Sequence, residues 1–275
     1  MTFTSRTEGC TAIAAGHPAR VALVSLTLIA VLAACGPKYA GTDVPAPTDP
    51  SAVVLRVLEQ PGFAGPTAGA PLPEFSLYGD GRVIVSTGRR GALATADEYR
   101  LSADGYRKIY RSALAAGLGR GRTLERAPSP DAPVLTLQLL VNGTVHTTQV
   151  IAPTAGDADR RALAAFRATL RPGSWSASDR AAGPAPYRPD RLAAVATWFA
   201  ARADPGAPRW PFADLAQGTR VSAGLCSVHT GAALATAVRL AAAQTPSTRW
   251  ASDGNLYYVA FRPLLPDEAG CAALG

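Results

Sequence analysis

The chain has 275 residues and a formal net charge of +7, a length that suits one or two domains. Hydrophobic residues make up 48% of it and charged residues 17%, so it can bury a core and does not have the composition of a disordered protein. No apolar run reaches the roughly 18 residues that span a bilayer, which excludes a multi-pass membrane protein. Only three histidines are present, which leaves little for a histidine-based metal site.

Residues 1–34 predict a lipoprotein signal peptide. Arg6 and Arg20 precede the uncharged residues 21–34, a pattern typical of a secretory signal and too short to span a membrane stably. The stretch ends in Leu32-Ala33-Ala34-Cys35, which resembles the bacterial lipoprotein box, where the cysteine thiol is acylated and the chain is cut before it. We expect lipid on Cys35 and a protein held on the outer face of the cytoplasmic membrane. Secretion after Ala34, or an uncleaved anchor, is the alternative.

The four cysteines have separate expected fates. Cys10 lies in the removed segment and Cys35 carries the lipid, which leaves Cys226 and Cys271. An exported protein is expected to pair two remaining cysteines, and a loop of about 45 residues would be stabilised by about 4 kcal/mol. The alternative is a redox or metal pair, since Cys226-x-x-His229 has ligand-like spacing, but a second such pair is missing.

The residues after the signal predict a tether and a first α+β domain. Residues 35–50 hold the lipidated cysteine and a segment with four prolines and two glycines, which reads as semi-extended. The domain, residues 51–171, has five expected parts. They are a strand at 52–58, a hairpin of 75–78 and 82–86, a helix at 102–116, a hairpin of 134–141 and 144–151 around Asn142-Gly143, and a helix at 157–170.

The expected helix at 102–116 has clear end signals. Ser102 suits the N-cap and Asp104 the first turn. Leu101 can pack onto Tyr106 across the cap, and Gly117 ends the helix.

Residues 172–189 are rich in Pro, Gly, Ser and Ala and predict a linker. A second α+β domain follows at 190–275 with one disulfide. Residues 192–199 suit a strand or a short helix equally, and the other expected elements are a strand at 220–230, a helix at 232–243 and a hairpin over 250–262. The predicted fold class is therefore α+β, with two small domains of antiparallel hairpins packed against helices. The disulfide would tie the C-terminal tail to the strand before the helix.

Three segments carry a family resemblance: FSLYGDGRVI at 75–84, PYRP at 186–189, and FRPLLPDE at 261–268 with Cys271. In this order they resemble an uncharacterised lipoprotein family of high-GC Gram-positive (actinobacterial) bacteria over most of the mature chain. The resemblance implies fold and localisation, and it carries no activity or catalytic residue.

Residues 51–171 also show a fainter similarity to emfourin-type modules, small α+β inhibitors of secreted metalloproteases. It rests on Gly62-Phe63, the Gly-Asp-Gly turn, Leu101-Ser102 and Pro130-Asp131-Ala132. It implies a protease inhibitor as an alternative function.

Candidate catalytic features have simpler explanations. Gly117-x-Gly119-x-Gly121 follows a helix, whereas a dinucleotide-binding loop follows a strand, and Ser174 and Ser176 do not fit the G-x-S-x-G pattern. His146 would face Leu139 across its hairpin. His229 ends a strand and is expected to be partly exposed, which makes it the better catalytic candidate. The carboxylates Asp80, Asp253, Asp267 and Glu268 fall in turns or the tail, where capping and solvation account for them.

An aromatic cluster and the net charge bear on partners. Trp198, Phe199, Trp210 and Phe212 form a contact patch if exposed and the second domain's core if buried, and we expect burial. From Cys35 onward the charge is +6, the total of +7 less +1 for the signal. This charge favours anionic lipid headgroups, acidic wall polymers or acidic partners. Nucleic acid is not expected, since no stretch interleaves arginines with aromatics.

The sequence therefore predicts a membrane-anchored extracytoplasmic lipoprotein that acts as a non-enzymatic binding module. We expect no cofactor and no metal, and a protein or cell-envelope partner whose identity the sequence does not indicate. A protease inhibitor built on the first domain is the alternative, and an enzyme using His229 is a third hypothesis.

Overall fold

The computed structural model describes residues 44–62, 65, 69–125, 131–153, 156–201 and 204–275, which belong to one compact unit, Tyr39–Gly275. Cys10, the predicted signal peptide, Cys35 and residues 36–43 lie outside the described residues.

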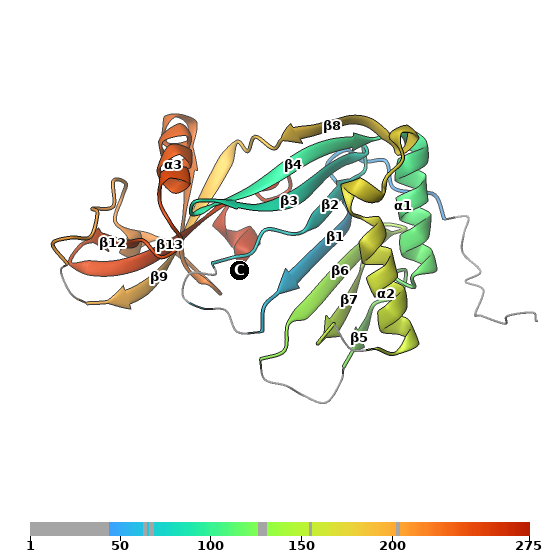
Figure 1. The fold of residues 1–275 in the computed structure, drawn as a ribbon, viewed down its shortest axis with the longest axis horizontal. Helices are drawn as coiled ribbons and strands as arrows, with labels where there is room; N and C mark the ends of the chain where they lie inside the picture. The colour runs from blue at the N-terminus through green and yellow to red at the C-terminus, as the bar shows by residue number, and fades with distance from the viewer. Residues whose placement is uncertain (1–43, 63–64, 66–68, 126–130, 154–155, 202–203) are drawn as a thin grey trace, which may run out of the picture. The chain divides into compact units, whose positions relative to one another are not determined.

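A single, mostly antiparallel sheet contains all thirteen strands of the described residues (Figure 1). Eleven strands follow the order β10-β11-β9-β13-β4-β3-β2-β1-β6-β7-β5, while β12 pairs with β13 and β8 with β4. In chain order they are β1 (Val53–Gln60), β2 (Phe75–Tyr78), β3 (Arg82–Arg90), β4 (Leu93–Leu101), β5 (Arg122–Leu124), β6 (Val134–Val141), β7 (Thr144–Ile151), β8 (Arg180–Pro186), β9 (Arg191–Ala200), β10 (Thr219–Val221), β11 (Gly224–Thr230), β12 (Arg249–Ser252) and β13 (Asn255–Pro263).

Three α-helices in the described residues cover parts of this sheet: α1 (Ala103–Ala115), α2 (Ala158–Thr169) and α3 (Gly231–Ala243). Helices α1 and α2 share one core with β1, β2 and β6, whereas α3 shares another with β9 and β13 (Figure 1). The mixed class with antiparallel hairpins and helices is as predicted. The division into two domains is not confirmed, because strands of both predicted domains join the same sheet.

The local signals of the first half are confirmed. The Ser102 hydroxyl caps α1 by accepting a hydrogen bond from the Gly105 amide at 3.1 Å, and Leu101 and Tyr106 are both buried in the core. Asn142 and Gly143 adopt φ of +49° and +77°, as a two-residue hairpin turn requires. His146 accordingly pairs with Leu139.

The described part of the predicted tether is attached to the core. Val44 and Ala46 are partly buried against the helices α1 and α2 and their strands. The Tyr106 hydroxyl donates a hydrogen bond to the Pro47 carbonyl. A proline-rich composition predicted an extended segment, but apolar side chains among the prolines bind residues 44–50 to the core.

The predicted linker at 172–189 is also structured. Trp175 is only 8% exposed and meets the ring of Tyr99 edge-on at a centroid distance of 5.3 Å. Beyond it, β8 pairs with β4 through Glu98, Arg100 and their neighbours. Most side chains of β8 are exposed, so the segment lacks the apolar alternation that predicts a strand. Its prolines are tolerated because β8 is an edge strand.

In residues 190–275 the structure decides between strand and helix for residues 192–199 and corrects the prediction for residues 220–230. Residues 191–200 form a strand, β9, which pairs with both β11 and β13. The single strand expected at 220–230 is instead a hairpin of β10 and β11, which pairs Val221 with Gly224. The predicted disulfide is present, and it joins Cys226 of β11 to Cys271 at the start of the last 3₁₀ turn.

A buried ion pair fastens the C-terminal tail to β13. Arg262 and Glu268 have side-chain exposures of 4% and 5%, and the guanidinium binds both carboxylate oxygens at 2.7 and 2.9 Å. Glu268 also accepts the Leu265 amide, and Arg262 donates to the Pro71 carbonyl. The tail carboxylate expected to be solvated is therefore an internal anchor.

Glu268→Gln is expected to lower the free energy of unfolding by about 3–5 kcal/mol, because it leaves a buried guanidinium without its countercharge. Arg107→Ala, which breaks the exposed pair with Asp104, is the control and should change stability by less than about 1 kcal/mol. Urea unfolding of the full chain measures both. Equal, small losses for the two variants would contradict the structural role of Glu268.

Candidate functional site

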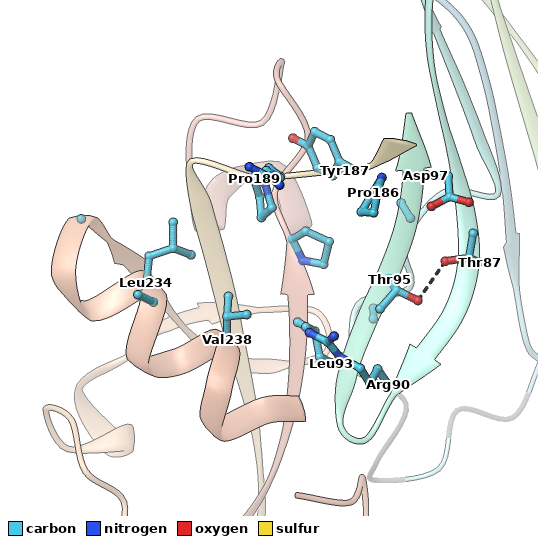
Figure 2. Close-up of a pocket in the computed structure, with 16 residues that line it drawn as sticks. Thr87, Arg90, Leu93, Thr95, Asp97, Pro186, Tyr187, Pro189, Leu234 and Val238 are labelled. Carbon is cyan, nitrogen blue, oxygen red and sulfur yellow. Dashed lines mark hydrogen bonds between the residues drawn. The ribbon is translucent and has the colours of Figure 1, made fainter. Parts of the chain in front are cut away.

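A cleft of about 480 Å³ lies between α3 and β4, and we refer to it as the α3–β4 cleft (Figure 2). Its walls are mainly apolar. Leu234 and Val238 project from α3, facing Leu93 on β4 (Figure 2), and Pro186 and Pro263 add further apolar surface. This volume and lining are typical of a pocket for a small ligand.

The cleft opens where β4 changes partner. From Asp97 to Leu101 this strand pairs with β8, but β13 reaches it only where Phe261 bridges Leu93. Ala94 and Ala96 lie between the two pairings and line the cleft. The space is therefore a consequence of sheet topology.

The tip of the β3–β4 hairpin holds the lower end of the cleft in place. The Ala92 amide donates a 2.8 Å hydrogen bond to the Ala241 carbonyl of α3. Gly91 beside it has φ +60°, and a Cβ at this position would overlap the Gln244 and Ala242 carbonyl oxygens. Glycine is required here because the turn is left-handed and the helix end is in direct contact.

The upper end is formed by the segment that leaves β8. The Tyr187 amide donates to the Ala96 carbonyl at 2.9 Å, and its hydroxyl donates to the Leu264 carbonyl at 2.8 Å. The Arg82 guanidinium lies 5.8 Å from the centre of the Tyr187 ring. Burial raises the pKa of this tyrosine to about 12, so it remains a neutral donor and positions the segment.

A bulge in β3 brings the hydroxyl of Thr87 next to the hydroxyl of Thr95 on β4. The pairing of β3 with β4 shifts between Ser86 and Gly88, which leaves Thr87 as the extra residue. Its hydroxyl donates to the Thr95 hydroxyl at 2.9 Å (Figure 2). Bulges often re-aim side chains beside binding sites, and both threonines line the cleft.

The charged groups of the cleft are not neutralised by one another. Arg90 comes from the β3–β4 hairpin, Arg188 from the segment after β8, and Asp97 from β4. None of these three side chains has a hydrogen bond or ion pair within the described parts of the chain. The lining therefore combines an apolar interior with two cations and one anion that can meet a ligand.

A larger pocket of about 770 Å³ borders the disulfide side of the sheet. Its lining contains Arg56, Arg262 and Glu268, but Arg56 binds Asp267 at 2.8 Å and the other two bind each other. These charges stabilise the tail, so the α3–β4 cleft is the better candidate site.

The predicted aromatic cluster does not form one patch. Trp210 is buried in the core under α3 and Phe212 packs partly against it. Trp198 and Phe199 are 58% and 42% exposed, contrary to the burial expected of them. As neighbours on β9 they project to opposite faces of the sheet.

The two histidines of the described residues are far apart in strand order. His146 is on β7, whereas His229 is on β11, where it is only 6% exposed instead of partly exposed as expected. Its ring lies 4.2 Å from that of Phe212, and its Nε2 has no hydrogen-bond partner among the described residues. Burial lowers the pKa of His229.

In the part of the chain that the structure describes, no group of three or more His, Cys, Asp or Glu side chains is placed to hold a metal ion. The described helices include none with the length and apolar character needed to cross a bilayer.

Sequence reasoning named none of the cleft residues as a site. The PYRP segment was singled out only for its family resemblance, and no strand was predicted at 93–101. The one available signal was the pair of adjacent arginines, Arg89 and Arg90, before Gly91 in a hairpin turn. By itself it is indistinguishable from an ordinary solvated turn.

Comparisons of the chain with protein-family models, curated proteins and solved structures find no match. The resemblances to the actinobacterial lipoprotein family and to emfourin-type modules therefore stay predictions.

The buried His229 predicts an acid-sensitive fold. Since its pKa is lowered in the folded protein, the unfolded chain binds more protons as the pH falls below the ordinary histidine value of about 6.5. The stabilising effect of a neutral His229 is thus present above that pH and lost below it. His229→Leu should reduce the fall in melting temperature between pH 7.5 and pH 5.

Thermal unfolding at several pH values measures this difference. At pH 8 the His229 side chain is neutral in both the folded and the unfolded chain. The difference in melting temperature between wild type and variant at this pH therefore measures the effect of the substitution on packing alone. Parallel melting curves for wild type and variant across the whole range would contradict the prediction.

Proposed function

We propose that this chain is a lipid-anchored extracytoplasmic protein that binds a small ligand in the α3–β4 cleft and performs no chemistry on it. The observation that carries the binding role is the cleft itself, an apolar pocket whose charged lining groups have no partner among the described residues. The localisation is supported by the residues up to Cys35. Acyl chains on that thiol would provide about 0.8 kcal/mol of membrane affinity per buried methylene group.

The framework around the cleft suits binding more than chemistry. Tyr187 is held by two hydrogen bonds, and Gly91 seats the hairpin against α3. The hydroxyls of Thr87 and Thr95 are hydrogen-bonded to each other. The buried His229 lies in the aromatic core with Phe212 and Trp210, and it is not a lining residue of the cleft.

The anchor is tested with Cys35→Ala in the producing cell. We expect the variant to lose labelling by a palmitate analogue and to leave the membrane fraction, because it lacks the thiol that carries the acyl chains. Cys10→Ala is the matched control and should keep both label and fractionation, since Cys10 lies in the segment predicted to be removed. Persistent labelling of the Cys35 variant would exclude lipid attachment at this residue.

The cleft is tested with Ala235→Trp. Ala235 lines the cleft and is exposed on α3, so an indole there fills the space at little cost to the core. Native mass spectrometry of protein purified from its own cells is expected to show a small bound molecule on the wild type and none on the variant. Thr236→Trp adds the same ring on an exposed position outside the lining and should keep the ligand. Equal ligand occupancy in both variants would overturn the assignment of this cleft.

A further inference from the structure

We infer that the α3–β4 cleft selects an anionic amphiphile, a small molecule with an aliphatic body and a phosphate or carboxylate group. This inference rests on the proposed binding function and specifies the class of ligand. It is drawn from the distribution of apolar and charged groups in the lining.

The apolar part of the cleft suits an aliphatic chain. Leu234 and Val238 face Leu93 across the gap (Figure 2), while Ala94 and Ala96 keep the β4 wall low. These side chains offer no hydrogen bond to a polar ligand body, which would lose its hydration there. Removal of an alkyl chain from water is favourable by about 25 cal/mol per Å² of apolar surface.

The charged part favours a negative group. Arg90 and Arg188 contribute two guanidinium groups against the one carboxylate of Asp97. Both arginines are exposed, and neither guanidinium is engaged by another described residue. Guanidinium groups match phosphate and carboxylate oxygens with paired, charge-assisted hydrogen bonds.

Asp97 restricts where that negative group can lie. Leu93, next to the Arg90 hairpin, is four strand positions from Asp97, a separation of about 13 Å. An anion at the Arg90 end therefore avoids the carboxylate, while Asp97 and the threonine hydroxyls can accept from hydroxyl groups of the ligand. Arg188 lies in the segment that crosses toward β9 and adds a second positive group at the cleft.

The test is calorimetric titration of the full-length protein with octyl phosphate, 1-octanol and inorganic phosphate at low ionic strength. We expect octyl phosphate to bind at least about tenfold more tightly than either fragment, because it alone combines both contacts. Arg90→Gln with Arg188→Gln should weaken octyl phosphate about tenfold or more, which corresponds to at least about 1.4 kcal/mol, and leave 1-octanol unchanged. Arg239→Gln, on α3 but outside the lining, is the matched control and should have no effect.

The outcomes separate the ligand class from the site. Equal affinity for octyl phosphate and 1-octanol, both abolished by Ala235→Trp, would overturn the anionic selectivity and leave the cleft as a binding site. Binding of neither amphiphile would overturn the inference. Binding to phosphatidylglycerol vesicles without binding of octyl phosphate would also overturn it, because the two arginines would then meet a membrane surface.

Discussion

Along its outer edge, strand β4 forms backbone pairs with two different strands, β8 and β13, and this divided pairing is the constraint on which the arrangement of the sheet depends. β8 pairs with its C-terminal half, and β13 reaches it only at Leu93. Next to it, the Ala92 amide donates a hydrogen bond to the Ala241 carbonyl in the last turn of α3. Together with the Arg56–Asp267 ion pair and the hydrogen bond from Arg262 to the Pro71 carbonyl, these contacts join the core under α1 and α2 to the core under α3.

The same constraint produces the cleft. Where neither β8 nor β13 lies against β4, the strand faces the side of α3, and the small side chains of Ala94, Thr95 and Ala96 form that wall. The helix itself lies close to the sheet because Ala237 and Ala241 are fully buried against it. The charged residues among the lining of this pocket are Arg90, Arg188 and Asp97. A lipid anchor on Cys35 would present such a pocket at the membrane surface.

Prediction from sequence worked where a structure is determined by near neighbours. The Asn142-Gly143 turn, the Ser102 cap and the apolar spacing of α1 and α2 each depend on residues within a few positions, and all were recovered. Prediction from sequence was wrong for residues 172–189, which were expected to form a linker, and for the C-terminal tail, whose carboxylates were expected to be solvated. Trp175 is buried against Phe75 and Tyr99 of distant strands. Glu268 binds Arg262 only six positions away, but Arg262 also binds the Pro71 carbonyl, 191 positions away in the chain. Within the described residues the ion pair that spans most of the chain, Arg56 with Asp267, joins residues 211 positions apart.

By itself the sequence predicted the helices α1 and α2, the hairpin around Asn142-Gly143 and the pairing of Cys226 with Cys271, the last because an exported chain would have only these two cysteines left to pair. It also carries the prediction of a lipid at Cys35. The tertiary structure alone decided that one sheet runs through both halves, that His229 is buried, and that Trp198 and Phe199 are exposed. It alone assembled the candidate site, because the cleft combines a hairpin tip, the end of β8 and one side of α3. Backbone pairing between distant strands, and not any local signal, brings these three segments together.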